Sequence, residues 1–341
     1  MNEDFIKGSV KKWFEEKDYR VLPEFGVKFN GYCRQIDVAA FRWKNDEEIE
    51  AVAVECKCLS TSREGCKEAL GQATDYQLFF PYVYIATQED KLYYADEEWI
   101  LTKLGLGRLM INEKGIVKEV TYPSNELFQQ NFLEEYLASQ VRDKAVLFLT
   151  FCELFPDAYT MHYFGGMRKG ELWVHNHPKD SVQFRVWCPA PSSDFKTTFF
   201  GINIESVYPI RNILKNMDVN YLSSVFSALP SDVTVWLGER PTKKDKWGTV
   251  ILDRERESSI PIEGSMFADG AIQACELTPK QIEEEIVERS KKLNGYVHFI
   301  IDKKLWNLDE TITRHECLKR MSEAKEVLNK PYQILNKWSK T

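Results

Sequence analysis

The sequence lacks any apolar run of the roughly 18 residues or more that a membrane-spanning helix requires. Its first residues, Met1-Asn2-Glu3-Asp4, are polar and acidic, unlike the start of a signal peptide. We therefore expect no membrane partner and a cytoplasmic protein.

Glycine-rich phosphate loops, internal repeats and low-complexity stretches are also missing, which argues against intrinsic ATP or NAD chemistry. There is no basic excess either, because 45 Lys and Arg stand against 52 Asp and Glu, a net charge of -7. Residues 1–121 alone hold 17 Lys and Arg against 22 Asp and Glu. Because phosphate polymers are bound through clustered cations, tight binding of one would need a second domain, a second subunit or a partner protein.

What the sequence does contain is a strong hairpin pattern near its start. Two runs rich in apolar, β-branched and aromatic residues, 34–43 and 49–58, flank the turn signal of residues 44–47. The pattern predicts two antiparallel strands. With the loop centred on Asp46, the residue numbers of facing partners add up to 92.

This register places charged side chains together. Asp37 faces Glu55, and Lys57 projects on the same face because side chains alternate along a strand. Only the small Ala39 and Ala53 lie beside them. The hairpin therefore predicts two acids and an amine at one point, and a slip of one residue would separate them.

Two adjacent carboxylates repel each other, and a hard divalent cation resolves that repulsion. Mg²⁺ takes oxygen ligands, accepts one or two protein carboxylates and fills its shell with water or phosphate oxygens. A nearby lysine can orient a water molecule or screen a phosphate. The chemistry indicated is metal-assisted phosphodiester hydrolysis.

The full pattern resembles the core of the PD-(D/E)xK nucleases, a superfamily of restriction endonucleases, Holliday junction resolvases and RecB-type nucleases. The residues that carry the resemblance are Asp37, Glu55-Cys56-Lys57, Gln72 and Tyr76. The resemblance implies an Mg²⁺ or Mn²⁺ ion held by Asp37, Glu55 and the backbone carbonyl of Cys56. It makes Lys57 the catalytic lysine and places Gln72 at the edge of the site. The proline of the family's name is Ile36 here, and the likeness covers about the first 120 residues.

Glu-x-Lys alone is a weak signal, since it also occurs at residues 15–17 and 323–325 in helix-like stretches. The partner-strand Asp37 and the helix carrying Gln72 strengthen it. The alternative is a hairpin with ordinary surface charges, in which Gln72 is a surface amide and Tyr76 a packing residue.

In the resembled family, an acid on the first helix often completes the metal shell. Glu3, Glu15 and Glu16 are candidates here, with Glu24 on the next strand as a further one. The position that a resolvase-like alignment favours falls on two lysines, residues 11 and 12, so the sequence leaves this ligand unassigned.

The 8 cysteines are scattered, and in a cytoplasmic chain we expect reduced thiols. Four of them, at 33, 56, 58 and 66, raise the alternative of an iron–sulfur or zinc centre like that of some RecB-type nucleases. Paired Cys-x-x-Cys spacing is missing, and Cys56 and Cys58 alternate with Glu55 and Lys57. These cysteines are therefore expected on the opposite, helix-covered face of the sheet.

The element order predicts an α/β N-terminal domain with a restriction endonuclease-like mixed sheet flanked by helices, over residues 1–121. Its second helix should begin with the capping box Thr61-Ser62-Arg63-Glu64. Residues 122–158 predict a helical linker. Residues 159–341 predict an α+β accessory domain with a mostly antiparallel sheet, for recognition of substrate, effector or partner. Its last helices are expected at 279–293 and 309–328.

Two features of the second domain bear on binding. The run containing Lys243, Lys244, Lys246 and Trp247 suits a nucleic-acid backbone and a stacked base, although a solvated loop is the plainer interpretation. His175-Asn176-His177 has the look of a metal site but no third ligand nearby, which favours a structural role.

The sequence thus favours a metal-dependent nuclease, with DNA as the expected substrate and a homodimer or a partner protein as an option. Two alternatives stay open: a nuclease-fold subunit of a multiprotein defence, restriction or repair complex, and a non-catalytic nucleic-acid-binding module. We also expect Asp37→Ala to leave stability unchanged or higher, because it removes one of two repelling acids.

Overall fold

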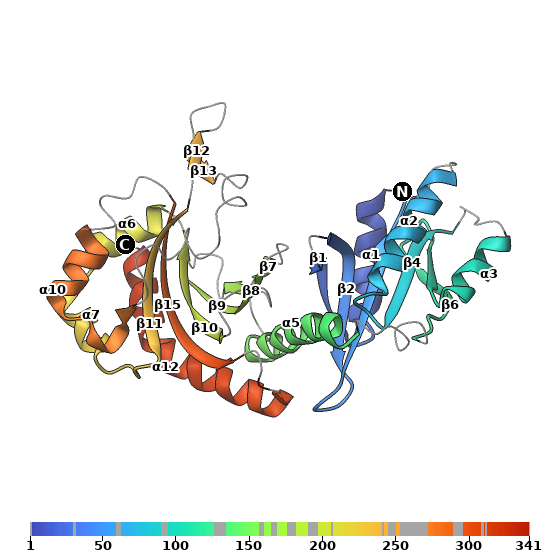
Figure 1. The fold of residues 1–341 in the computed structure, drawn as a ribbon. Coiled ribbons are helices and arrows are strands. Elements are labelled where there is room, and N and C mark those ends of the chain that lie inside the picture. Colours follow the sequence, from blue (N-terminus) through green and yellow to red (C-terminus); the bar gives the residue numbers. More distant parts are fainter. Residues whose placement is uncertain are drawn as a thin grey trace.

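The computed structural model describes residues 2–29, 32–58, 63–89, 95–125, 134–156, 160–164, 169–175, 182–189, 197–205, 207–240, 242–244, 250–252, 272–288, 296–307, 310 and 312–340. These residues form two large sheets, each with helices packed against it, and one short two-stranded sheet. Figure 1 shows the two large sheets in separate lobes with helix α5 between them. Within the described ranges, no helix is both long and apolar enough to cross a membrane.

The N-terminal sheet has six strands whose spatial order is their order in the chain. Its first three strands pair antiparallel, β3–β4 and β4–β5 pair parallel, and β5–β6 pair antiparallel. The expected mixed sheet is therefore confirmed. The strands are β1 (Arg20–Phe29), β2 (Tyr32–Trp43), β3 (Ile49–Cys56), β4 (Tyr82–Gln88), β5 (Gly107–Ile111) and β6 (Val117–Thr121).

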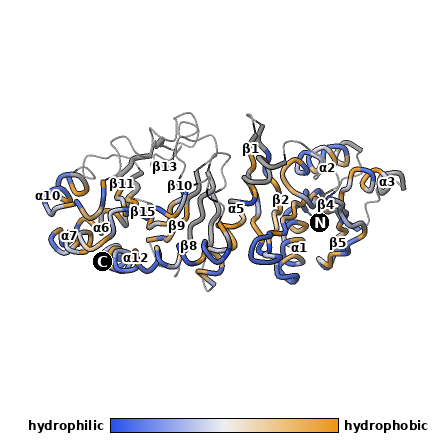
Figure 2. Tube along the Cα trace, turned by 60° about the horizontal axis from the view of Figure 1, so that its bottom comes forward, coloured by the Kyte–Doolittle hydropathy of each residue, from blue (hydrophilic) through white to orange (hydrophobic). Residues whose placement is uncertain are grey.

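Helices cover both faces of this sheet. On one face, α1 (Glu3–Glu15) buries Ile6, Val10 and Phe14 in one cluster with even-numbered residues of β2 and β3. On the other face lies α2 (Arg63–Tyr76), whose alanines pack into the cluster that holds Ala39 and Ala53. Figure 2 shows hydrophilic and hydrophobic positions alternating along α1, as expected for a helix with one buried face. A short helix, α3 (Ala95–Lys103), precedes β5.

The C-terminal sheet has seven strands, all paired antiparallel, in the order β14-β11-β15-β10-β9-β8-β7. This confirms the expected antiparallel sheet. The strands are β7 (Thr160–Phe164), β8 (Lys169–His175), β9 (Val182–Pro189), β10 (Thr197–Glu205), β11 (Val233–Arg240), β14 (Ile272–Gln273) and β15 (Tyr296–Asn307). The helical elements of this lobe are α6 (Val207–Asn216), α7 (Val219–Phe226), η1 (Ala274–Glu276), α10 (Pro279–Gln281), η2 (Ile282–Glu288) and α12 (Arg314–Lys340).

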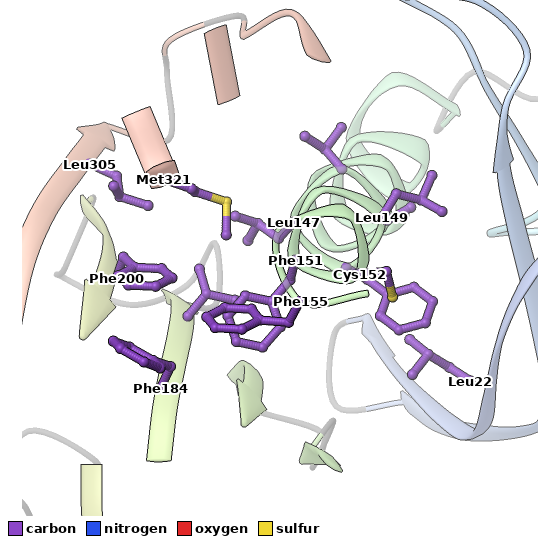
Figure 3. Close-up of a cluster of buried hydrophobic side chains, with 14 of the residues drawn as sticks. Leu22, Leu147, Leu149, Phe151, Cys152, Phe155, Phe184, Phe200, Leu305 and Met321 are labelled. Carbon is purple, nitrogen blue, oxygen red and sulfur yellow. The ribbon is translucent and has the colours of Figure 1, made fainter. Parts of the chain in front are cut away.

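Helix α5 (Glu134–Leu154) lies inside the segment predicted as a linker, but it is a core element. The Phe148 ring lies 6.2 Å from that of Phe41 on β2, and the Phe151 ring lies 6.1 Å from that of Phe200 on β10. Figure 3 shows Cys152 of α5 on the side of Leu22 while Phe151 lies toward Phe200. The two lobes therefore share one hydrophobic core across α5.

The last helix is longer than predicted. The sequence suggested an end at residue 328, yet α12 continues through Pro331 to Lys340. An internal proline costs a helix about 3 kcal/mol. The apolar face nevertheless continues, since Leu328, Tyr332 and Leu335 are all buried, and this packing offsets the cost.

A candidate active site on the β2–β3 hairpin

The hairpin has the predicted register. Ala39 pairs with Ala53 and Phe41 with Ala51, so the predicted register is confirmed from Val38 to Trp43, and continuing it by one residue places Asp37 opposite Glu55. Ala39 and Ala53 are fully buried, and their small size lets α2 lie close over this face. The hairpin thus fixes the position of the acids, and α2 forms the wall opposite them.

Asp37 is held through both carboxylate oxygens. Its Oδ2 accepts a hydrogen bond of 2.8 Å from the backbone N–H of Cys56, which ties β2 to the end of β3. Its Oδ1 lies 2.8 Å from the ammonium of Lys7, a residue of α1. Asp37 is therefore oriented by the hairpin backbone on one side and by a cation on the other.

Glu55 is the most deeply buried acid of the site, with 3% of its surface exposed. Tyr76 of α2 lies with its hydroxyl 2.6 Å from Glu55 Oε2 and 3.0 Å from the backbone oxygen of Gln35. Burial, reinforced by the charge of Asp37, raises the pKa of Glu55 to about 8, although the Tyr76 hydrogen bond and Lys57 oppose the shift. Near neutral pH the carboxyl group therefore keeps its proton. The Tyr76 hydroxyl donates to Glu55 Oε2 and also lies within hydrogen-bond distance of the Gln35 carbonyl, so it anchors the acid against α2.

Lys57 follows directly after β3, and its backbone N–H donates to the carbonyl of Ala86 on β4. Its ammonium lies 3.1 Å from Glu68 Oε2 on α2. Burial lowers the pKa of Lys57, but Glu68 and Glu55 outweigh that effect and the net shift is upward. The side chain stays cationic at neutral pH, as a phosphate-binding lysine requires.

Helix α2 presents one residue per turn to this hairpin, at positions 68, 72 and 76. Glu68 contacts Lys57 and Tyr76 contacts Glu55, so Gln72 lies between two anchored neighbours. The Gln72 side-chain oxygen Oε1 is buried and has no hydrogen-bond partner among the described residues. Such an atom costs about 1–3 kcal/mol unless something binds it.

The structure also narrows the choice of a first-helix acid. Glu15 and Glu16 lie at the far end of α1 and pair with lysines one turn earlier, each at 3.8 Å. Glu3 and Glu24 instead surround Lys7, with oxygens 3.6 and 3.1 Å from its ammonium. Only these two of the four candidates therefore reach the edge of the site.

Glu24 has a strained backbone. Its φ of 58° lies in the left-handed region, which costs a non-glycine residue about 1–3 kcal/mol. It falls opposite Asp37, since its neighbours Pro23 and Phe25 pair with Val38 and Ile36. Gln35 donates to its Oε2, which helps to hold this conformation.

Lys7 is the residue that sequence reasoning missed. The only signal was its position four residues after Glu3, the spacing of an ion pair on a helix. Its approach to Asp37 depends on how α1 packs against β2 and could not be derived from the pattern. Burial lowers the pKa of Lys7, but its contacts with Asp37 and Glu24 outweigh burial and the net shift is upward. The amine therefore stays protonated at neutral pH.

The donor set suits Mg²⁺ or Mn²⁺ better than zinc. In the part of the chain that the structure describes, no three His, Cys, Asp or Glu side chains gather as a complete cage. Two carboxylates on one hairpin, beside a buried amide oxygen without a partner among the described residues, supply oxygen donors of the kind that surround a hard cation and its bound water. The residues present therefore fit the ion that the resemblance implies.

The cysteine alternative loses support. Cys56 packs against α1 with Ile6 and Val10, on the face opposite Glu55, as predicted. Burial raises the pKa of its thiol well above the ordinary value, so the thiol stays protonated. A sulfur-bound centre at this position would need the opposite strand register.

Several predicted residues cannot be placed at this site. Lys246, Trp247, His177 and the capping residue Thr61 lie outside the described residues. Lys243 and Lys244 fall on β12 (Thr242–Lys244), which pairs with β13 (Val250–Leu252) in the C-terminal lobe, far from β4 in Figure 1.

No known family matches the chain by its sequence profile, and no curated protein matches it. The resemblance therefore rests on the motif and on the geometry above.

Proposed function

We propose that this protein is a metal-dependent nuclease of the PD-(D/E)xK type, with a restriction endonuclease-like N-terminal fold and DNA as its substrate. The observation that carries the proposal is the arrangement of Asp37 and Glu55 on one hairpin face, with Lys57 at the strand end. The alternative, a hairpin that carries ordinary surface charges, does not account for a buried glutamate with a raised pKa.

In this proposal Asp37, Glu55 and the carbonyl of Cys56 hold Mg²⁺ or Mn²⁺. Such an ion lowers the pKa of a bound water and stabilises the charge of a phosphodiester under attack. Glu55 must release its proton to become a ligand, and Tyr76 keeps the resulting carboxylate in place. Lys57 leaves Glu68, which is exposed, and donates to a phosphate oxygen. Gln72 accepts a hydrogen bond from the attacking water.

The acidic balance of residues 1–121 supports a role for the rest of the molecule in substrate binding. The C-terminal lobe joins the hairpin through α5 and through Arg314, whose backbone N–H donates to the Asp46 carbonyl at 3.1 Å. A homodimer or a partner protein would serve the same purpose. The net negative charge also favours the second candidate, a nuclease-fold subunit of a multiprotein complex.

The test is a cleavage assay of the full chain with Mg²⁺ or Mn²⁺ on duplex, branched and single-stranded DNA and on RNA. We expect cleavage that EDTA stops and that Lys57→Met lowers by about 100-fold or more. Lys118→Met, a lysine of β6 outside the site, is the matched control and should retain activity. Metal binding without cleavage of any substrate would favour the complex-subunit candidate. If the protein neither binds the metal nor cleaves any substrate, the nuclease proposal is refuted.

A further inference from the structure

Lys7 occupies a fixed position at the edge of the site. It stands in the first turns of α1, between the N-cap Asn2 and the buried Val10. Its neighbour Ile6 is fully buried, so the backbone of this turn is anchored against the sheet. The ammonium therefore reaches Asp37 from a rigid element.

One ammonium faces three carboxylates here. Lys7 Nζ lies 2.8 Å from Asp37 Oδ1, 3.1 Å from Glu24 Oε1 and 3.6 Å from Glu3 Oε1. The side chain is only 20% exposed, so water screens these contacts poorly. A cation surrounded by carboxylate oxygens is also the coordination pattern of a bound metal ion.

The contact with Asp37 is selective for one oxygen. Oδ2 is engaged by the Cys56 N–H, which belongs to the hairpin itself. Among the described residues, Oδ1 is contacted by Lys7 alone. Oδ1 is therefore the oxygen that a metal ion can take without breaking the hairpin, and it is the one that the ammonium already holds.

We propose that Lys7 is a built-in competitor of the divalent ion, which must displace its ammonium from Asp37 Oδ1 to bind. This inference rests on the proposed function, because it takes Asp37 as a metal ligand. The competition has two consequences. It raises the metal concentration needed to load the site, and it neutralises the acidic cluster in the metal-free protein. After displacement the ammonium keeps Glu24 and Glu3 as partners and stays beside the site.

The test is calorimetric titration of the full-length protein with Mn²⁺ at one fixed pH near 8, the same for every variant, because protons also compete for the carboxylates. Lys7→Met removes the ammonium, and we expect its dissociation constant for Mn²⁺ to fall about tenfold or more, the factor that one charged hydrogen bond represents. Lys7→Gln should behave in the same way and serves if Lys7→Met fails to fold. Lys7→Arg keeps the cation and should bind Mn²⁺ like the wild type.

Lys11→Met is the matched control, since Lys11 lies one turn further along α1 and pairs with Glu15 instead. It should leave Mn²⁺ affinity unchanged. Wild-type binding with unchanged or weaker affinity in Lys7→Met and Lys7→Gln would overturn the competition and leave the metal site standing. Folded wild type and variants that all fail to bind Mn²⁺ would overturn the metal site and the competition with it.

Discussion

Both large sheets bury acidic side chains, but they differ in how the acid is compensated. The C-terminal sheet pairs it with a buried arginine, whereas the N-terminal sheet places it beside a second acid. On the C-terminal sheet, the buried Arg185 and Asp302 form a two-pronged ion pair, with Nε 3.0 Å from Oδ1 and Nη2 on Oδ2. They reach each other across Gly201 of β10, where a Cβ would overlap Asp302. Charge, geometry and space are matched at this pair.

The N-terminal hairpin shows no such match. Glu55 is buried beside Asp37 with a raised pKa, and the buried oxygen of Gln72 has no partner among the described residues. Glu24 adds a strained backbone at the same edge. A buried ion pair whose charges match is already satisfied within the fold. Two close carboxyl groups without matching positive charge disfavour each other's ionised form, and a bound cation would relieve that repulsion.

The largest expected effect separates the two regions by activity. Asp37→Asn and Glu55→Gln should each lower metal-dependent cleavage by about 100-fold or more while the protein stays folded. Thr234→Val on the C-terminal sheet is the control and should cleave normally. The measurement is initial cleavage rate together with circular dichroism, and wild-type activity in either hairpin variant would remove that residue from the site.

The second prediction concerns the matched pair. Asp302→Leu removes the carboxylate that faces the buried Arg185 guanidinium and should destabilise the protein by about 3–5 kcal/mol, measured by urea unfolding. The double variant Arg185→Leu with Asp302→Leu removes both charges and should recover much of the loss. A single variant as stable as the wild type would show that the pair is not what stabilises this sheet.

The third prediction uses the raised pKa of Glu55. Below its ordinary pKa of 4.5, Glu55 is protonated in the folded and the unfolded chain and has no effect on stability. Between 4.5 and about 8 the unfolded chain loses the proton and the folded chain keeps it. Without metal, the free energy of unfolding should therefore fall as pH rises through this window, by up to about 1.4 kcal/mol per pH unit.

Glu55→Gln cannot lose a proton, so its stability relative to the wild type should increase across the same window. Glu15→Gln, at the far end of α1, is the matched control. Urea unfolding in EDTA at several pH values gives the comparison, and parallel wild-type and Glu55→Gln curves would contradict the buried, protonated glutamate.

The smallest expected effect is on the stability of Asp37→Ala, and it differs from what the sequence predicted. Repulsion alone predicted that Asp37→Ala leaves stability unchanged or higher, but Asp37 accepts from the Cys56 N–H and pairs with Lys7. Asp37→Ala should therefore cost about 1–3 kcal/mol in the metal-free protein, because it leaves a backbone donor unpaired. Asp37→Asn retains an acceptor and should cost less. A thermal melt in EDTA decides between the two expectations.

The sequence by itself determined the hairpin and its register. Alternation of apolar residues around a polar turn leaves one register that buries Ala39 and Ala53, and this register also places Asp37 opposite Glu55. The four-residue spacing of Gln72 and Tyr76 likewise placed them on one face of α2. Such local rules also predicted the mixed and the antiparallel sheet.

Only the tertiary structure decided which distant groups meet these residues. A sequence boundary at residue 121 excludes α5, yet Phe148 of α5 packs on Phe41 in the core of the N-terminal lobe, so residues 1–121 alone would expose that surface. The contact between Lys7 and Asp37 likewise depends on where α1 lies on the sheet. Periodicity fixes which face of an element is buried, but the neighbour that covers it follows from packing among all the elements together.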